Sequence, residues 1–440
     1  RAGVDERSST PARTRTERAM AITQQELGRR LRLAREACSF TQDHVGERVG
    51  LSRSAIAQIE LGNRAVTSLE LDQFARLYGR DIRDFLAPEF AEDNALLALF
   101  RANEDIANRD QTAEALRHCL SIGREFTNLE RLIGLDRDLT SLIRYAYPLP
   151  RSRFDAIKQG TAIAEQERRR LGLGDGPIED IVDLLEQQGI RTALVDLPDD
   201  VSGLTLTDRD AGPFVVANRS EHLLRRTFSF AHEFAHVLLD VDSTGIISRA
   251  GDRAELMEVR ANAFAANFLM PEAGGRQFLS ALGKAGEAKL LAETPTTEDD
   301  AMAIEARGDR TESEIAFHDV VLLAHHFGVS RSVALYRLRN LQLLSERELK
   351  DFLQQEQGGR GRDLARFLDL PQPDHASERN KFRHRFLNLA IEAFTRDIIS
   401  RSKLEELFAA ILERPRSEIP FETLDDIIAE RPTGVSVPAV

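Results

Sequence analysis

The amino-acid sequence predicts a mainly helical protein with a small α+β part. Helix periodicity, with capping residues at the ends of the periodic stretches, fills most of the chain. Only residues 190–218 have the alternating β-branched pattern that is typical of strands. At 440 residues, the chain is long enough for two to four domains. We therefore expect a helical N-terminal domain, a central α+β domain with a small sheet, and a helical C-terminal region.

The composition and charge exclude several classes of protein. The formal net charge of −13 does not favour nucleic-acid binding by the whole chain, so any DNA contact must come from a local patch. Two cysteines, Cys38 and Cys119, are too few for a disulfide framework and fit a reducing, cytoplasmic environment. The chain has no apolar run of about 18 residues, so no membrane span is expected. Residues 1–19 are polar and arginine-rich, and we expect a disordered arm or an upstream extension there.

Residues 20–88 are expected to form a domain of five short helices. Thr41 and Ser52 are placed to cap the second and third helices, and Gly50 supplies the turn between them. Two short helices joined by a glycine-containing turn are typical of a helix-turn-helix domain. The helices are predicted at residues 25–38, 42–49, 53–60, 69–78 and 82–86.

The stretch TQDHVGERVGLSRSAIAQIELGNR, residues 41–64, resembles the lambda-repressor-like (XRE) family of helix-turn-helix regulators. The similarity extends over residues 24–87. It implies that the second helix of the motif enters the major groove of double-stranded DNA while the first helix crosses the backbone. Base edges would then be read by Arg53, Ser54 and Gln58, and phosphates would be held by Gln42, Ser52 and Arg64.

The local charge of this N-terminal domain is only weakly positive. Between residues 27 and 86 the chain has ten arginines and eight acidic residues, a local net charge of +2. A single copy should therefore bind DNA with low, salt-sensitive affinity. We expect a homodimer on a two-fold-related operator. The alternative is a helical domain that contacts other proteins.

Residues 89–154 carry no catalytic signal. Amphipathic helices are predicted at 94–100 and 114–135, and we expect a helical linker or dimerisation segment. Cys119 lies in this stretch, where a buried, inert thiol is expected rather than a metal ligand.

The α+β domain is expected over residues 155–275. Helices are predicted at 154–171 and 178–188, followed by a strand at 190–195. The segments GLTLTD and PFVVAN, joined by RDAG, then predict a β-hairpin.

The most informative stretch is TFSFAHEFAHVLLD, residues 227–240, which contains the H-E-x-x-H pattern. On a helix, His232 and His236 lie on one face and can present two imidazoles to one metal ion. Glu233 is rotated by about 100° from His232, which suits a group that holds a water rather than the metal itself. Burial of these polar groups in an apolar helix would cost several kcal/mol without partners, which metal coordination would supply.

A catalytic metal site needs a third protein ligand. Asp240 lies eight residues after His232, about 12 Å along a straight helix, which is too far for one ion. Glu258 opens EVRANAFAANFLMP, a second helical stretch whose alanines suit a close helix–helix contact. Glu258 is therefore the better candidate ligand. Asn262, four residues further along the same face, is expected to orient an imidazole or the carboxylate.

RTFSFAHEFAH followed by EVRANAFAANFLMP resembles the ImmA/IrrE family of intracellular zinc peptidases, over residues 155–275. The resemblance implies a zincin-like fold in which His232, His236 and Glu258 bind Zn²⁺, with Mn²⁺ as an alternative working metal. It also implies that Glu233 is the catalytic base. Ala235 stands where the family often has glycine, which leaves the ligands intact.

Residues 276–440 are predicted to be helical. Within them, residues 315–344 again consist of a helix, a Gly-Val-Ser turn and a helix, and resemble the helix-turn-helix-like segment of ImmA/IrrE proteins. His325 and His326 point about 100° apart on a helix and are a poor metal pair. Nucleic-acid binding and packing are both open as roles for Arg331, Arg337 and Arg339.

The two resemblances together imply a DNA-binding transcriptional regulator that carries a zinc-dependent endopeptidase. The implied substrate is the protein itself or a partner helix-turn-helix repressor, in a stress, phage or mobile-element response. Single-stranded DNA or a change in metal supply is the implied trigger. The alternative is a non-proteolytic transcription factor that senses a small ligand such as an acyl-CoA. A third hypothesis is a peptidase that uses its first domain only to dock on a repressor. The intact Glu233 favours the first hypothesis, because a sensor needs metal ligands but no base.

Overall fold

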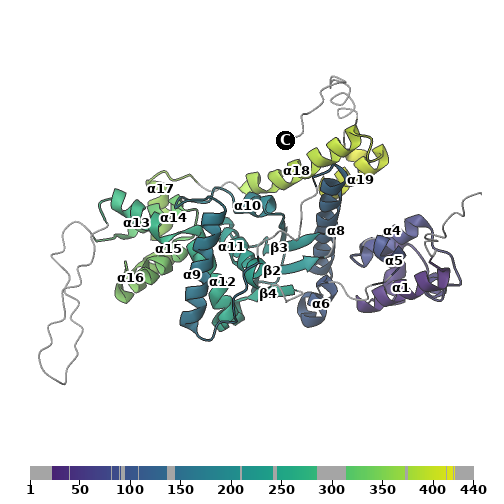
Figure 1. Ribbon diagram of the computed structural model, residues 1–440, viewed down its shortest axis with the longest axis horizontal. Helices are drawn as coiled ribbons and strands as arrows, with labels where there is room; N and C mark the ends of the chain where they lie inside the picture. Colours follow the sequence, from purple (N-terminus) through teal and green to yellow (C-terminus); the bar gives the residue numbers. More distant parts are fainter. Residues whose placement is uncertain are drawn as a thin grey trace, which may run out of the picture. The chain divides into compact units, whose positions relative to one another are not determined.

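The computed structural model describes residues 22–38, 40–80, 82–88, 90, 95–107, 109–135, 144–208, 211–240, 245–284, 314–371, 375–412, 414–419 and 421. The chain divides after Leu97 into two units. The described residues are mainly helical and contain one four-stranded sheet, in the second unit (Figure 1), which confirms the predicted fold class. None of the described helices is both long and apolar enough to cross a membrane. The arm predicted at residues 1–19 lies outside the described residues.

The first unit contains the five predicted helices. Thr41 and Ser52 accept hydrogen bonds from the backbone N–H groups of His44 and Ala55, at 3.1 and 3.2 Å. Gly50 has a φ of 72°, the left-handed conformation that ends the second helix. The caps and the turn are therefore those predicted. The helices are α1 (Gln24–Ala37), α2 (Gln42–Val49), α3 (Arg53–Glu60), α4 (Ser68–Leu77) and α5 (Ile82–Leu86).

Two contacts fix α3 against α1. Gly28 of α1 has no side chain, and a Cβ at this position would overlap the carbonyl oxygen of Ile59. Arg35 of α1 donates to the buried Glu60 at the end of α3, with Nε 2.6 Å from Oε1. The inner side of α3 is thus held by the core, while Arg53, the first residue of the helix, is exposed.

The second unit is built around the sheet, whose strand order is β1-β3-β2-β4. β2 and β3 form the predicted antiparallel hairpin, β4 is antiparallel to β2, and β1 is parallel to β3. β1 and β4 are therefore the two edges of the sheet. The strands are β1 (Arg191–Val195), β2 (Val201–Asp208), β3 (Gly212–Asn218) and β4 (Gly245–Arg249).

One face of the sheet is covered by α11 (Leu223–Leu239), the helix that carries the H-E-x-x-H pattern. Val215 and Ala217 of β3 share a core with Phe230 and Phe234 of α11. The neighbouring helices of this layer, which belong to the same core, are α9 (Arg153–Arg170), α10 (Ile181–Gln187) and α12 (Leu256–Leu269).

The other face is covered by α8 (Asp110–Leu132). Phe214 precedes Val215 on β3 and therefore points to the opposite side of the sheet. A Cβ at Gly123 of α8 would lie 3.2 Å from the Phe214 ring, so the helix passes directly over this side chain.

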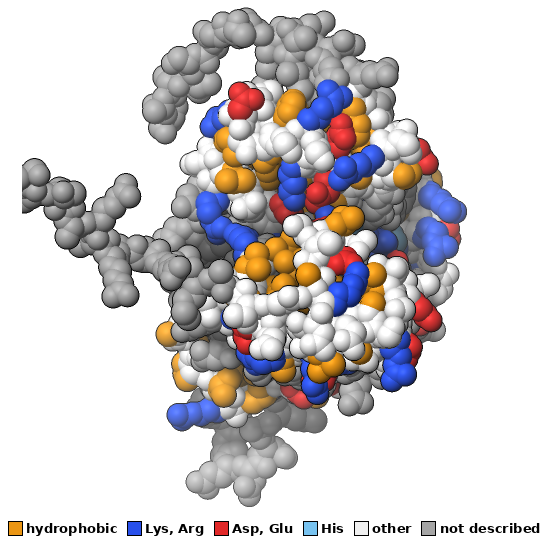
Figure 2. All heavy atoms as spheres, turned by 90° about the vertical axis from the view of Figure 1, so that its right-hand side faces the viewer, with side chains coloured by type: hydrophobic (Ala, Val, Ile, Leu, Met, Phe, Trp, Pro, Cys, Tyr) orange, Lys and Arg blue, Asp and Glu red, His pale blue; other side chains and the backbone are white. Residues whose placement is uncertain are grey.

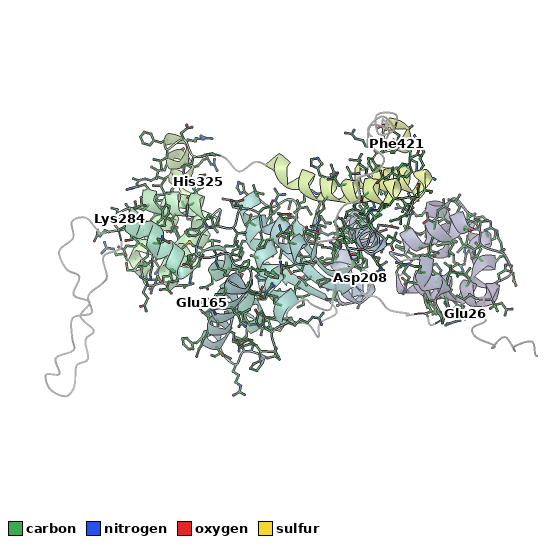
Figure 3. The ribbon with its side chains drawn as sticks, turned by 45° about the horizontal axis from the view of Figure 1, so that its top comes forward. Glu26, Glu165, Asp208, Lys284, His325 and Phe421 are labelled. Atoms are coloured by element: carbon green, nitrogen blue, oxygen red, sulfur yellow. The ribbon has the colours of Figure 1, made fainter. Side chains whose placement is uncertain are left out.

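This position of α8 differs from the linker or dimerisation segment expected at residues 89–154. Arg124 makes two hydrogen bonds to the buried carboxylate of Asp208 at the end of β2, at 3.0 and 2.7 Å, and Figure 3 shows Asp208 beside α8. Thr127 donates to the Ala211 carbonyl at 3.3 Å. α8 is therefore a structural part of the second unit. The shorter helices before it are α6 (Ala95–Ala102) and α7 (Glu104–Ala107).

α12 lies unusually close to α9 because Gly160 of α9 has no side chain. A Cβ there would overlap the carbonyl oxygen of Arg260 and lie 3.0 Å from the Cβ of Ala263. Ala263, one of the alanines predicted to allow a close helix–helix contact, is thus in such a contact. α12 ends at Leu269, two residues before Pro271, as predicted.

The C-terminal helices fall into two groups. α14 and α15 form the predicted helix–turn–helix-like segment, with Gly328 in the left-handed conformation between them, and share the core of α11 and α12. α18 and α19 pack on α8 instead, where Phe386 lies 5.8 Å from Phe126 between ring centroids. The helices are α13 (Glu272–Ala281), α14 (Phe317–His326), α15 (Arg331–Asn340), α16 (Glu346–Gln357), α17 (Arg360–Phe367), α18 (His375–Thr395) and α19 (Arg401–Leu412).

The arginines of α15 are engaged within the second unit. Arg337 is buried and donates to the carbonyl oxygen of Met270 at 3.0 Å. Arg331 donates to Glu356 at 2.7 Å. Of the two roles left open by the sequence, these contacts favour packing over nucleic-acid binding.

Candidate metal centre and DNA-binding surface

The two histidines of the H-E-x-x-H pattern converge on α11. His232 and His236 are one turn apart, and their Nε2 atoms lie 3.2 Å from each other. His222 caps the start of this helix, and an apolar run forms its buried side. The local sequence therefore places both imidazoles on one face, as predicted from their spacing, and inside the protein, as predicted from the apolar flanks.

The third side chain comes from α12. Glu258 Oε2 lies 3.1 Å from His232 Nε2, and Glu258 Oε1 lies 3.4 Å from His236 Nε2. One ligand atom from each of the three residues lies within 4.8 Å of the others, and all three side chains are buried. The structure thus brings together the three residues predicted as ligands. Two imidazole nitrogens and one carboxylate oxygen are the donor set of open, catalytic zinc sites.

Further hydrogen bonds orient both imidazole rings. His232 Nδ1 lies 3.1 Å from Asn262 Oδ1, and His236 Nδ1 lies 2.8 Å from Asp240 Oδ2. Asp240 is in turn paired with the buried Arg260 of α12. Because the Nδ1 atoms are occupied, the Nε2 atoms of both rings face Glu258. Such outer contacts set the tautomer and raise the basicity of histidine ligands.

The sequence predicts this role for Asn262. For Asp240 it predicts only that the residue does not bind the metal. The signal for Asp240 was nevertheless present in the sequence. It lies four residues after His236, the spacing that puts two side chains on one helix face.

The triad combines a charged carboxylate with a protonated imidazole. Burial by itself raises the pKa of Glu258, but hydrogen bonds to His232 and His236 and the charges of these rings lower the pKa to about 2. Burial lowers the pKa of His236, but its hydrogen bonds to Asp240 and Glu258 and the charge of Glu233 outweigh this and raise the pKa to about 10. At neutral pH a metal ion must therefore displace a proton from the site.

Glu233 follows His232 directly on α11, its charge acts on His236, and it is fully buried. Its Oε2 atom accepts a hydrogen bond from Thr205 Oγ1 of β2 at 2.7 Å, whereas Oε1 is buried and has no hydrogen-bond partner among the described residues. Gly203 of β2 leaves room here, since a Cβ at this position would lie 2.7 Å from Oε1. An unpaired buried carboxylate oxygen is costly. The unpaired Oε1 of Glu233, in the residue next to a candidate ligand, fits a site for a divalent metal and a water or substrate group.

Thr205 and Gly203 carried no local signal in the sequence. They belong to the predicted hairpin, but which strand lies under Glu233 depends on the packing of α11 on the sheet. Cys119, for which the sequence predicts a buried thiol rather than a metal ligand, is half-buried and belongs to α8, which lies on the sheet face opposite α11.

The predicted base-reading residues of the first unit are exposed on α3. Arg53, Ser54 and Gln58 all reach solvent, and Asn63 donates to Gln58 at 3.0 Å. Arg53 has only a loose ion pair with the exposed Asp43, at 3.5 Å. These side chains are therefore accessible to the major groove of a bound DNA.

The predicted phosphate contacts have partners within the domain. Gln42 donates to Glu60 at 2.8 Å, and Arg64 donates to Glu70 at 2.7 Å. Ser52 caps α3 and lies 3.0 Å from Ser54 Oγ. Basic and acidic side chains are interspersed on the face of the molecule shown in Figure 2.

The fold and these sites define a helix-turn-helix domain followed by a metallopeptidase-like domain. Comparison with known families gives the same division. Residues 26–86 match a helix-turn-helix domain, and residues 185–339 match a peptidase family model described as an IrrE N-terminal-like domain. The chain therefore combines a helix-turn-helix domain with an IrrE N-terminal-like domain, the fusion that the sequence predicts. No curated protein matches the chain.

The matched peptidase segment differs from the predicted range of 155–275. It begins within α10 and extends through α14 and nearly all of α15. The later boundary has a physical basis, because α14 and α15 share the hydrophobic core of α11 and α12.

The ligand assignment makes distinct predictions for Glu258 and Asp240. Glu258→Ala should abolish stoichiometric zinc binding, because only two imidazoles remain. Asp240→Asn should keep one zinc per chain but weaken its affinity by about 10- to 100-fold, because Asp240 orients His236 without touching the metal. Zinc content after equilibration in graded zinc buffers measures both effects. Wild-type zinc affinity in Glu258→Ala would show that the ligand set is wrong.

Proposed function

We propose that this protein is a DNA-binding transcriptional regulator that carries a metal-dependent endopeptidase. The observation that carries the proposal is Glu233. A buried carboxylate with one unpaired oxygen lies beside three converging ligand atoms, in a domain that matches a peptidase family. A site that only stored or sensed a metal would need the ligands but not this carboxylate.

Zn²⁺, or alternatively Mn²⁺, would be held by His232, His236 and Glu258. When bound, it would lower the pKa of a water and polarise the scissile carbonyl. Glu233 would accept the proton of that water at Oε1 and deliver it to the leaving amine. Thr205 would keep the carboxylate in place through Oε2, which leaves Oε1 free for the proton.

The substrate that we propose is a helix-turn-helix protein, either this chain or a partner repressor. The support is the combination of domains and the family resemblance to peptidases that act on such repressors. Cleavage between residues 87 and 155 would separate the DNA-binding domain from the second unit. We propose that cleavage belongs to a stress, phage or mobile-element response and that single-stranded DNA is the trigger. We also propose that the protein acts in the cytoplasm as a homodimer on a two-fold operator.

A non-proteolytic regulator that senses a small ligand, such as an acyl-CoA, is the alternative. In that case Glu233 would have no chemical role, and its replacement would leave regulation unchanged. The same variant therefore separates the two functions.

Intact-mass measurements over time test the peptidase. Zinc- or manganese-loaded protein, incubated with and without single-stranded DNA, should give a fragment cut between residues 87 and 155, or cut an added helix-turn-helix repressor. Glu233→Gln should bind the metal normally and give no fragment, because the base is lost. Glu255→Gln, which changes an exposed glutamate near α12, is the matched control and should cut like wild type. Equal cleavage by Glu233→Gln would refute the role of Glu233.

DNA recognition by α3 makes a separate prediction. Gln58→Ala should relax the preference at one base pair by about 1–3 kcal/mol, because a glutamine can pair with two positions on one adenine edge. Competition binding with operator variants, selected first with the wild-type protein, measures the preference. Gln73→Ala, an exposed glutamine on α4, should change nothing. An unchanged preference in Gln58→Ala would mean that this residue does not read DNA.

A further inference from the structure

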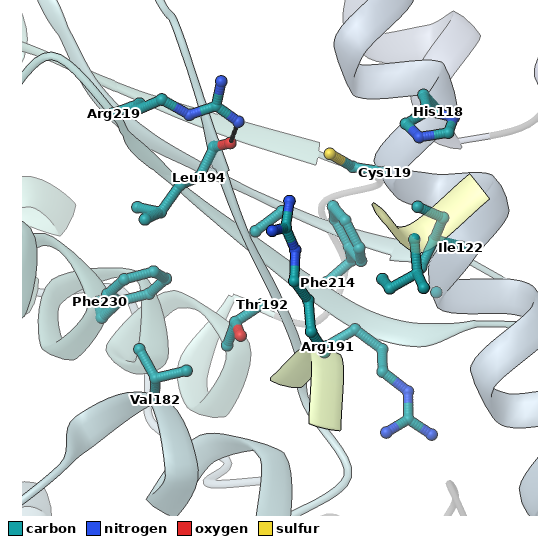
Figure 4. A pocket seen from close by; sticks show the side chains of 14 residues that line it. His118, Cys119, Ile122, Val182, Arg191, Thr192, Leu194, Phe214, Arg219 and Phe230 are labelled. Atoms are coloured by element: carbon teal, nitrogen blue, oxygen red, sulfur yellow. Dashed lines mark hydrogen bonds between the residues drawn. The ribbon is translucent and has the colours of Figure 1, made fainter. Parts of the chain in front are cut away.

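A cavity of about 170 Å³ lies along the free edge of β1 (Figure 4). Four consecutive strand residues, 191–194, line it, together with side chains from β3, α8, α10, α11, α18 and α19. None of the three candidate metal ligands is among the lining residues. The cavity is therefore separate from the metal centre. One of its lining residues, Phe230, belongs to α11, the helix that carries His232.

The backbone of β1 offers an unpaired donor and acceptor to this cavity. The carbonyl of Val195 accepts from Arg219 N, just past the end of β3. Because successive peptide groups of a strand alternate in direction, Thr192 and Leu194 point to the free edge. These two residues have four backbone N–H and C=O groups, and side chains already bind two of them. Thr192 N–H donates to Glu186 at 2.8 Å, and Leu194 C=O accepts from Arg219 at 2.6 Å. The Thr192 carbonyl and the Leu194 N–H have no partner in the described part of the chain.

These two groups flank Ala193, and this spacing fits one residue of an extended peptide. In parallel pairing, such a residue donates its N–H to Thr192 C=O and accepts from Leu194 N–H. The neighbouring positions on the edge are already taken by Glu186 and Arg219. A bound chain can therefore pair through one residue only, which selects a short ligand over a long added strand.

The cavity offers room for one apolar side chain. Residues paired across parallel strands point to the same face, so the side chain of the bound residue would lie on the side of Ala193, toward Ile122 and Phe214 (Figure 4). A dry cavity of about 150 Å³ holds a benzene-sized molecule. The volume here is thus sufficient for a leucine, valine or phenylalanine side chain.

The charged lining favours an acidic group beside that residue. Arg219 Nε is buried and has no hydrogen-bond partner among the described residues, and its ion pair with the exposed Asp196 is loose, at 3.4 Å. Arg383 of α18 also lines the cavity. Arg191 differs, because its guanidinium is already paired with the buried Glu130 and Glu186.

We propose that the edge of β1 is a binding site for a short extended peptide, with an apolar residue in the cavity and an acidic residue next to Arg219. Since Phe230 lies two residues before His232, an occupant would contact the helix that carries two candidate metal ligands. The site does not depend on the chain being a peptidase, because its donor, acceptor, cavity and guanidinium lie outside the metal centre.

Calorimetric titration of the full chain tests the site. The probe is acetyl-Ala-Leu-Asp-amide, with valine and phenylalanine versions, and the Glu233→Gln protein is used so that hydrolysis cannot remove it. N-methylation of the leucine should weaken binding by about three- to tenfold, because it removes the donor to Thr192 C=O. N-methylation of the aspartate, whose N–H points away from β1, is the matched control and should have little effect. Equal binding of both methylated peptides would overturn the edge pairing.

Two protein variants locate the acidic group. Arg219→Gln should weaken binding of the probe by about tenfold or more. Arg225→Gln, which changes an exposed arginine on α11, should leave binding unchanged. Arg383→Gln provides a second test on another helix if Arg219→Gln lowers the melting temperature. Absence of binding by all three probes at millimolar concentration overturns the proposal. The proposal is also overturned if Arg219→Gln and Arg383→Gln both bind the probes like wild type, because the peptide would then bind at the metal centre or elsewhere.

Discussion

The close contact of Glu258 with His232 and His236 is the interaction on which the second unit depends. Three polar groups that prefer water lie in the middle of a hydrophobic core, where unpaired charges are costly. Each is held by a further group: Asn262 behind His232, and Asp240 with Arg260 behind His236. Gly160 lets α9 support α12 closely. These contacts hold the carboxylate and the two rings in place from both helices.

The sheet completes the site from the other direction. β2 lies under α11 and brings Thr205 to one oxygen of Glu233, while Gly203 leaves the other oxygen unobstructed. The hairpin is held in turn by α8, whose Arg124 pairs with Asp208. The base that we propose gains from this arrangement, since one oxygen is fixed by a hydrogen bond and the other is left for the proton.

Local patterns in the sequence predict many of the helices and the candidate metal ligands. The helices of the first unit are set by Thr41, Ser52 and Gly50, which act within a few residues of their own position. The candidate metal ligands His232 and His236 follow from their i, i+4 spacing, and Glu258 from the helical stretch that it opens. The role of α8 was not predictable, because Arg124 and Asp208 are 84 residues apart and neither carries a local signal. Gln42 and Arg64 likewise looked available for phosphates, but their partners Glu60 and Glu70 become visible only once the helices pack.

In the metal centre that we propose, two histidines and one glutamate bind a single metal ion and leave room for a water. X-ray absorption spectroscopy of the zinc-loaded full chain at the zinc edge tests it most directly. We expect two imidazole nitrogens and additional oxygen donors at about 2.0–2.2 Å from the zinc, with no sulfur. A sulfur shell at about 2.3 Å, or three or more imidazoles around the zinc, would contradict it.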